Sequence, residues 1–422
     1  MNIVKPRGTK DRFDQEFDKY EIVLNAAIKT AQRFGFRQVL LPIFERAELF
    51  HRQNEASDIV KKELYEFFDR GARKMALRPE MTAAMVRMVG ENKLLATQPL
   101  PIKLFTHGPV FRYERPQTGR QREFYQFDVE IIAGNLIYDV VDVISFADCF
   151  LTDLNLRNKT LLKINYLGSI NSRKLWIKSL QDYFLPFKNE LSQLSQERLL
   201  VNPLRILDDK TDSQLDFVKN APKIEQFLTN AEKETFAKVL AILDHLKIAY
   251  EIDHRLVRGL DYYTGTVFEF VQNESTSQQA TLIAGGEYDG LVAELTGKNH
   301  PGIGLAIGMD RCLELLDIKL IEEKHELDAM RILLIGLDAK WFNDLYVVCS
   351  QWQKAGIPIN FNSSVFKVDK AIKLATLWNY RYLAIVGTSE LNNQTIVIKD
   401  LSTHQQTVIL QTELWSWWQK RK

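Results

Sequence analysis

Near the start of the chain, apolar residues recur every three or four positions, which is the spacing of a helix face. The pattern predicts a helix through Phe17, Tyr20, Leu24, Ala27, Ile28 and Ala31. Gly35 is expected to end this helix, and the apolar run at 39–41, before Pro42, predicts a strand.

Two β-hairpins are predicted after this strand. Residues 64–69 and 74–78 have strand patterns around a turn that contains glycine, and Pro79 is expected near the first position of the next helix. Residues 102–112 and 123–132 have longer strand patterns on either side of a polar loop. We expect these two segments to form a long antiparallel pair.

A helical stretch interrupts the strands in the middle of the chain. Residues 167–252 are rich in Lys, Gln and Glu, and their mostly helical spacing between strand-rich stretches indicates an insertion. Strand patterns return at 257–271 and 281–284, and a helix is predicted over 309–320.

The C-terminal part has a pattern of its own. After the charged linker 322–328, apolar strand runs alternate at first with helical stretches, at 332–335, 357–359, 382–386 and 395–398. We therefore expect two domains, a larger one over residues 1–327 that contains the insertion and a small α/β domain over residues 328–422.

Composition excludes several classes of protein. No apolar run is long enough to span a membrane, and the start of the chain has no signal sequence, so a cytoplasmic location is expected. Three cysteines without a C-x-x-C pair indicate neither disulfides nor a cysteine zinc site. The net charge is +1, but residues 331–422 carry 11 basic and 6 acidic residues. This excess is compatible with nucleic-acid contact, and equally with a solvated surface.

Charged residues lie within the predicted strand 123–132. Because side chains alternate along a strand, Phe124, Gln126, Asp128 and Glu130 share one face. Carboxylates held by a rigid sheet suit a ligand that carries an ammonium group. The alternative is that this face is simply exposed to water.

The loop between the two long strands is rich in arginine. Arg112, Arg115, Arg120 and Arg122 fall within eleven residues. The planar guanidinium group matches phosphate oxygens, so this loop is a candidate site for a triphosphate or a nucleic acid. A solvated hairpin tip is the alternative.

Three segments resemble the signature motifs of class II aminoacyl-tRNA synthetases. Residues 35–50 resemble motif 1, residues 111–130 resemble motif 2 with its Phe-Arg-Tyr-Glu-Arg-Pro-Gln, and residues 304–311 resemble motif 3. Arg-Gly-Leu-Asp-Tyr-Tyr-Thr at 258–264 and Ala-Gly-Gly-Glu-Tyr-Asp-Gly-Leu at 284–291 are similar to the histidine-specific motifs of the histidyl-tRNA synthetase family. The resemblance to the bacterial form of that family covers essentially the whole chain.

The resemblance implies a fold and a reaction. The fold is α+β, with a six-stranded antiparallel sheet interrupted by the helical insertion at 167–252 and followed by an anticodon-binding domain. The reaction joins L-histidine and ATP into histidyl-adenylate with release of pyrophosphate, and then transfers histidine to tRNA(His) with release of AMP. Mg²⁺ would arrive with ATP, and no metal site built by the protein alone is implied.

The resemblance also implies roles for individual residues. Arg258 and Arg112 would be catalytic, since fixed positive charge near the α-phosphate favours the joining of two anions. The ATP phosphates would be contacted by Arg112, Arg120 and Arg311. Histidine would be bound by Glu80, Thr82, Gln126, Glu130, Arg258, Tyr262 and Tyr263. The acceptor end of the tRNA would meet Arg115 and Gln117.

Some of these roles have alternatives. Neighbouring strand residues face opposite ways, so one of Tyr262 and Tyr263 is expected to meet the imidazole while the other shapes the pocket.

The C-terminal domain offers phosphate contacts at Lys367, Lys370 and Lys373. Its tryptophans, Trp415, Trp417 and Trp418, could stack on bases, although a docked terminal helix is the favoured explanation.

The chain departs from the family pattern at Glu287, where an arginine is usual, and at Asp310, where a glutamate is usual. The change at Glu287 could alter histidine affinity or break an ion pair. The resemblance of motif 1 implies a homodimer with Pro42 near the interface.

Two other functions are considered. One is a non-catalytic histidine-sensing paralogue such as the regulatory subunit of ATP phosphoribosyltransferase, which typically lacks the anticodon domain and active-site residues that this chain keeps. The other is a class II synthetase for a different amino acid, against which residues 258–263 argue.

Overall fold

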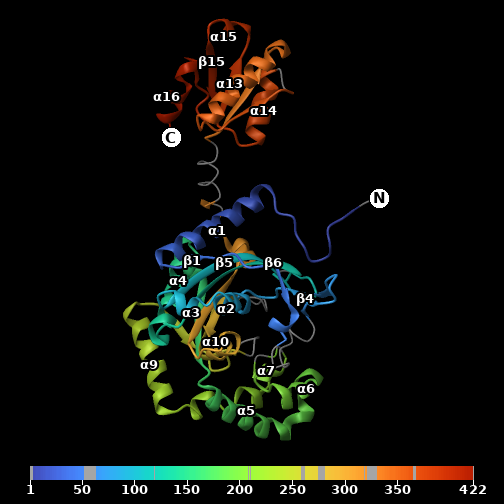
Figure 1. Cartoon of the computed structure of the whole chain (residues 1–422), viewed down its shortest axis with the longest axis vertical. Helices are drawn as coiled ribbons and strands as arrows, with labels where there is room; N and C mark the ends of the chain where they lie inside the picture. The colour runs from blue at the N-terminus through green and yellow to red at the C-terminus, as the bar shows by residue number, and fades with distance from the viewer. Residues whose placement is uncertain are drawn as a thin grey trace. The chain divides into compact units, whose positions relative to one another are not determined.

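The computed structural model describes residues 3–51, 63–117, 119–207, 209, 211–257, 262–273, 281–317, 319–320, 330–364 and 367–421. The chain forms two compact units, Met1–Asp317 and Ile318–Lys422 (Figure 1). Their boundary lies ten residues before the one expected from the charged linker, and that linker falls outside the described residues. No helix in the described ranges is long and apolar enough to cross a membrane.

An eight-stranded sheet organises the first unit. Its strands lie in the order β1 (Arg37–Gln38), β5 (Ile102–Phe111), β6 (Glu123–Ile132), β11 (Gly302–Gly308), β10 (Thr281–Glu287), β9 (Thr264–Gln272), β7 (Thr160–Tyr166) and β8 (Tyr250–Ile252). The six strands from β5 to β7 pair antiparallel, and the short edge strands β1 and β8 pair in parallel with their neighbours. The sheet therefore contains the six antiparallel strands that were expected and, in addition, one short parallel strand at each edge.

Each face of this sheet is covered by helices. Phe127 of β6 stacks on Phe146 of α4 (Leu136–Asp153), which also contacts α1 (Asp14–Arg33). On the opposite face, Ile132 of β6 packs with α2 (Thr82–Glu91) and α10 (Asp289–Thr296). The helix α11 (Met309–Leu315) contacts α1 of the first layer. The alternation predicted for β6 is therefore confirmed, because Phe127 and Ile132 pack against different helical layers on the two faces of the sheet.

A small sheet precedes α2. It pairs β2 (Phe44–Arg46), β4 (Lys74–Leu77) and β3 (Glu66–Phe68), which confirms the first hairpin. The helix that follows begins at Thr82, three residues later than Pro79 suggested, because both carboxylate oxygens of Glu80 accept from the Ala83 amide at 3.2 Å and cap its first turn. The strand expected at 39–41 lies instead at Arg37–Gln38. The short helix α3 (Leu94–Thr97) then leads into β5.

The insertion is mostly helical, as predicted. It contains α5 (Ile170–Phe184), α6 (Gln193–Val201), α7 (Leu204–Leu207), α8 (Asp216–Lys219) and α9 (Asn230–His245) around a core that includes Trp176. Glu232 joins its two ends, since its carboxylate accepts from the Ser169 amide before α5 and from Thr229 at the start of α9. One carboxylate therefore serves two helix N-termini.

The second unit is an α/β domain with its own core. Its sheet has the order β13 (Ile359–Asn362), β12 (Ile332–Gly336), β14 (Tyr382–Val386), β15 (Thr395–Asp400) and β16 (Gln406–Leu410), and the first three strands are parallel. The helices are α13 (Phe342–Lys354), α14 (Val368–Leu377), α15 (Thr388–Asn392) and α16 (Leu414–Gln419). Trp417 and Trp418 are buried against Tyr382, so a docked terminal helix is the correct explanation for both.

Candidate functional site

A large cleft of about 1370 Å³ opens in the first unit. Its walls come from the middle of the sheet, from the loop between β5 and β6, from the N-terminal segment and from the insertion. The residues that line it include Lys10, Arg112, Arg120, Phe124, Gln126, Arg198, Arg205, Glu269 and Arg311. The arginine loop and the polar stripe predicted from the sequence thus meet at one cavity.

Three arginines face this cleft together. Burial and the nearby positive charges of Arg112 and Arg120 lower the pKa of the Arg311 guanidinium. Arg311 donates to the Thr281 carbonyl, and Arg120 pairs with Glu114 at 2.9 Å. A bound anion would offset the repulsion among these three cations, so this wall is suited to a polyphosphate.

Arg112 is held from two sides. Its Nε donates to the Pro79 carbonyl at 3.0 Å, and its guanidinium lies 5.2 Å from the ring centre of Phe124. Both Arg112 and Phe124 line the cleft. The side chain is therefore fixed before any ligand binds, which is what electrostatic catalysis requires.

The polar stripe of β6 continues from the cleft into the protein interior. Gln126 lines the cleft, while Asp128 and Glu130 are each 1% exposed. Glu130 accepts from the Thr82 hydroxyl at 2.6 Å and from the Tyr288 hydroxyl at 2.5 Å. Burial raises the pKa of Glu130 to about 8, against the effect of these two hydrogen bonds. A cation beside this carboxyl would favour its ionised form.

The two tyrosines do not alternate as expected. Their ring centres lie 4.8 Å apart, and the Tyr262 ring also meets Tyr288 edge-on at 6.1 Å. The expectation of opposite faces was wrong because β9 begins only at Thr264, so the strand rule does not apply to them. Arg258, the other predicted residue of this segment, lies outside the described residues.

The residues proposed for the tRNA acceptor end lie at the outer part of the loop. Arg115 and Gln117 are both exposed, and neither is among the described residues that line the cleft. Gln117 and Arg120 exchange backbone hydrogen bonds of 3.0 and 2.8 Å, which close the loop tip. Gln117 is thus hydrogen-bonded through its backbone to Arg120, one of the three arginines of the cleft wall, although its own side chain is exposed.

The N-terminal segment supports the site in a way that the sequence did not reveal. Arg12 forms an ion pair with Asp310, and its guanidinium lies 4.8 Å from the centre of the Tyr125 ring. The second oxygen of Asp310 accepts from the Tyr125 amide at 3.0 Å. The substitution of the usual glutamate by Asp310 thus leaves a carboxylate that joins β6, α11 and the N-terminal segment.

Glu287 is buried within the sheet rather than exposed to the cleft. It is 4% exposed, and Oε1 accepts from the Thr266 amide at 2.7 Å. Burial raises its pKa to about 8, with the Thr266 hydrogen bonds acting in the opposite direction. The departure from the family pattern is therefore accommodated largely as a neutral acid near pH 7.

This burial predicts a pH dependence of stability. Between the pKa of an unfolded carboxyl, near 4.5, and about 8, folded Glu287 keeps a proton that the unfolded chain releases, so stability falls as pH rises. The limiting slope is about 1.4 kcal/mol per pH unit. The thermal unfolding midpoint of the unaltered protein should fall between pH 6 and pH 8, and we expect this fall to be smaller in Glu287→Gln. Some fall should remain in the variant, because Glu130 also has a raised pKa and destabilises the protein over the same pH range. Equal losses in both proteins would contradict this assignment.

Comparison with known proteins places the chain in a family. The sequence profile of the histidyl-tRNA synthetase family matches residues 8–167 and 190–312. A histidine–tRNA ligase of Ureaplasma parvum serovar 3 is 43% identical over 98% of this chain and 99% of its own length. The histidine–tRNA ligase of Mycoplasma genitalium is 40% identical over 98% of this chain and 99% of its own length.

Solved structures have the same fold. The apo histidyl-tRNA synthetase of S. aureus has a TM-score of 0.80 at 29% identity, over 99% of this chain and all of that one. An ATP phosphoribosyltransferase regulatory subunit/histidyl-tRNA synthetase from Bacillus halodurans C has a TM-score of 0.64 at 17% identity, over 92% of this chain and 98% of its own. At that identity the likeness shows a shared fold and nothing about function. On the family profile and these near-full-length relatives, the chain belongs to the histidyl-tRNA synthetase family.

Proposed function

We propose that this protein joins L-histidine to tRNA(His) in two steps, through a histidyl-adenylate formed from ATP. Membership of the family makes it an aminoacyl-tRNA synthetase. The single observation that best supports the two-substrate site is that Arg112, Arg120 and Arg311 face one cleft whose wall continues into the buried carboxyls of β6.

In the first step, the histidine carboxylate attacks the α-phosphorus of ATP and pyrophosphate leaves. The two reactants are both anions, so the protein must offset repulsion and align them. We assign the α-phosphate to Arg112 and the distal phosphates to Arg120 and Arg311, with Mg²⁺ arriving on ATP. Arg258 is proposed to lie beside the reacting carboxylate.

For histidine, we assign the α-ammonium group to Glu80, Thr82, Gln126 and Glu130. The Thr82–Glu130 hydrogen bond supports this assignment because it ties α2 to β6 at the buried end of the stripe. The imidazole is assigned to Tyr262 and Tyr263, whose hydroxyls can bond ring nitrogens. Release of a proton from Glu130 would accompany binding of the ammonium group, since a nearby cation lowers the pKa of a carboxyl.

The direct test is ATP–pyrophosphate exchange with each of the twenty amino acids in turn. Exchange with histidine alone is the expected result. A folded protein that binds histidine but supports no exchange would instead favour the histidine-sensing paralogue. Exchange with a different amino acid would overturn the assignment of the histidine pocket.

We also assign the second unit to the anticodon region of the tRNA. Lys367, Lys370 and Lys373 are exposed at and along α14, and Trp378 at its end is 50% exposed. Basic side chains near an exposed aromatic ring are suited to phosphates and an unstacked base. Trp415, which is 45% exposed, is a second stacking candidate.

A truncation tests this assignment. Because residues 1–317 form a compact unit, deletion of residues 330–422 is expected to preserve histidine-dependent pyrophosphate exchange. Charging of tRNA(His) should fall by about 100-fold or more, as several phosphate and base contacts are lost together. Unchanged charging would contradict an anticodon role for the second unit.

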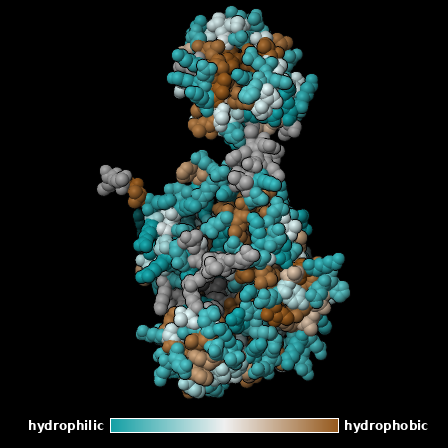
Figure 2. Space-filling model, turned by 180° about the vertical axis from the view of Figure 1, so that it is seen from behind, coloured by the Kyte–Doolittle hydropathy of each residue, from teal (hydrophilic) through white to brown (hydrophobic). Residues whose placement is uncertain are grey.

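A homodimer in the cytoplasm completes the proposal. The segment around Pro42 exposes Leu40 (81%), Ile43 (45%) and Phe44 (54%), and apolar side chains also interrupt the hydrophilic surface elsewhere (Figure 2). Contiguous exposed apolar residues favour burial against a partner. A second copy of the chain is the partner that the motif 1 resemblance implies.

A further inference from the structure

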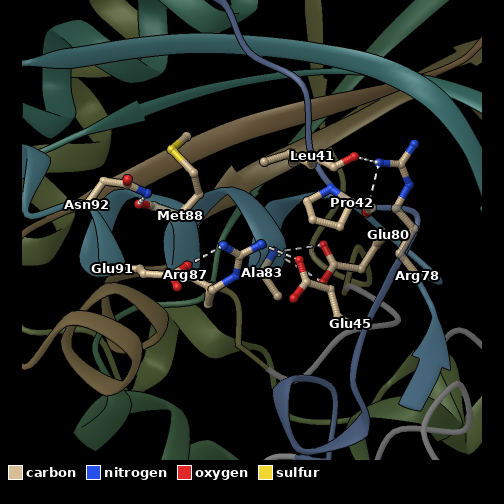
Figure 3. Close-up of polar contacts among 10 residues, drawn as sticks. All are labelled: Leu41, Pro42, Glu45, Arg78, Glu80, Ala83, Arg87, Met88, Glu91 and Asn92. Atoms are coloured by element: carbon tan, nitrogen blue, oxygen red, sulfur yellow. Dashed lines mark hydrogen bonds and ion pairs between the residues drawn. The ribbon is translucent and has the colours of Figure 1, made fainter. Parts of the chain in front are cut away.

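Two arginines flank the segment that carries Glu80, and they differ sharply in surroundings. Arg87 lies on α2, is half-buried, and pairs with Glu45 and with the more exposed Glu91 (Figure 3). Arg78 is 3% exposed, and its guanidinium points toward Leu41 and Pro42 (Figure 3). A nearly fully buried guanidinium is rare unless hydrogen bonds and opposite charge stabilise it.

The hydrogen bonds of Arg78 are all to backbone. Nε donates to the Pro109 carbonyl at 2.9 Å, and Nη1 donates to the carbonyls of Leu41 at 3.1 Å and Pro42 at 3.3 Å. Its own amide donates to Ile43 at 3.0 Å and its carbonyl accepts from Phe111 at 2.9 Å. Arg78 therefore fixes the start of the segment 78–80 against β5 and against the chain that precedes β2.

The sheet leaves room for this guanidinium. A Cβ atom on Gly108 would lie 2.5 Å from Nη2 of Arg78, and Gly108 has a φ of +151°. Gly108 pairs with Gln126, next to Asp128 on the same strand. A side chain at position 108 would thus displace Arg78 from the stripe.

Opposite charge comes from the stripe itself. Neither carboxylate oxygen of Asp128 has a hydrogen-bond partner among the described residues, although both are buried. Burial raises the pKa of Asp128 well above its usual value, Glu130 and Glu80 act in the same direction, and Arg78 and Arg112 oppose them. Arg112 lines the cleft and is assigned to the α-phosphate, whereas Arg78 is buried and is not among the described residues that line the cleft, so we take Arg78 as the cation that serves this carboxyl. Without Arg78, Asp128 would be held more firmly as a neutral acid.

We propose that Arg78 is a positioning residue of the histidine site, which orients Glu80 through the segment 78–80 and supplies the charge that keeps Asp128 available as a counter-ion for the ammonium group of histidine. This inference rests on the proposed function. It assigns an electrostatic role to Asp128, which lies between Gln126 and Glu130 on the same face of β6 and whose carboxylate has no hydrogen-bond partner among the described residues. It also explains why a buried arginine, rather than an apolar residue, stands at position 78.

The test compares Arg78→Lys and Arg78→Met with the matched changes Arg87→Lys and Arg87→Met. In pyrophosphate exchange, Arg78→Met should raise the KM for histidine by about 10-fold or more, and the KM for ATP by less than about twofold, since one displaced charged contact is worth roughly a factor of ten. Arg78→Lys keeps the charge and should recover part of the loss. Both Arg87 variants should leave both KM values within about twofold.

A second readout isolates the ammonium group. Histidinol keeps that group, whereas imidazole propionate lacks it, and both can be measured as inhibitors of exchange. Arg78→Met should weaken histidinol inhibition by about 10-fold and leave imidazole propionate inhibition nearly unchanged. Equal weakening of both inhibitors, or of neither, would overturn the proposal.

If Arg78→Met does not fold, Asp128→Asn takes its place. That change keeps the shape of the side chain and removes the charge, and it should produce the same selective loss of histidinol inhibition. Asp128→Asn with wild-type histidinol inhibition would overturn the electrostatic role. Failure of the unaltered protein to exchange with histidine would instead reject the proposed function, so the two failures are distinguishable.

Discussion

Replacement of Arg112 by alanine should lower histidine-dependent pyrophosphate exchange by about 10²–10³-fold, the usual effect of removing one preorganised donor from a developing anion. The loss should appear mainly in kcat. Arg112 is held by the Pro79 carbonyl and the Phe124 ring before ATP binds, so its charge is already in place when the α-phosphate becomes more negative. The measurement is steady-state exchange at saturating ATP and histidine.

Arg115→Ala is the matched control for this result. It makes the same substitution on the same loop, at an exposed residue that is not among those lining the cleft in the described chain. Exchange should be unchanged in this variant, while transfer to tRNA(His) slows. Near-normal exchange in Arg112→Ala, or equal losses in both variants, would reject the role given to Arg112.

The second large effect is expected at Glu130. Glu130→Gln keeps the size of the side chain but removes the negative charge at the proposed ammonium site. Loss of a buried charged hydrogen bond amounts to about 1.5–3 kcal/mol, so the KM for histidine should rise by about 10- to 150-fold. The KM for ATP should change little, because the phosphates are assigned to other residues.

Its pH dependence provides an independent check. In the unaltered protein the ionised fraction of Glu130 grows as pH rises toward about 8, so histidine should bind more tightly over that range. Glu130→Gln should lose this trend. Glu287→Gln is the control, since Glu287 is equally buried and has a similarly raised pKa, but is bonded to β9 instead. A KM for histidine that shifted equally in both variants would contradict the assignment.

Local patterns allowed much of this site to be predicted. The two-residue period of β6 placed Gln126 and Glu130 on one face, and the density of arginines marked the loop beside them. Both signals act over a few residues, so a single sequence contains them. The strand β8 was missed and β1 was expected two residues too late, because two or three residues are too few for a period to be visible.

Contacts between distant segments were not predictable in this way. The Tyr288–Glu130 hydrogen bond joins residues 158 positions apart, and the Arg12–Asp310 pair joins residues 298 positions apart. Nothing near either residue indicates its partner. The adjacency of Tyr262 and Tyr263 was missed because the strand begins two residues after the first of them, and boundaries are the least certain part of any pattern.

The order of the strands has a consequence for synthesis of the protein on the ribosome. β6 pairs with β5 on one side, but its other neighbour, β11, begins about 170 residues later in the chain. At about 5–20 residues per second, roughly 10 to 35 seconds separate the synthesis of these two strands. During that interval the edge of β6 that later pairs with β11 has no native partner, so the nascent chain is exposed to mispairing and to chaperones until β11 emerges.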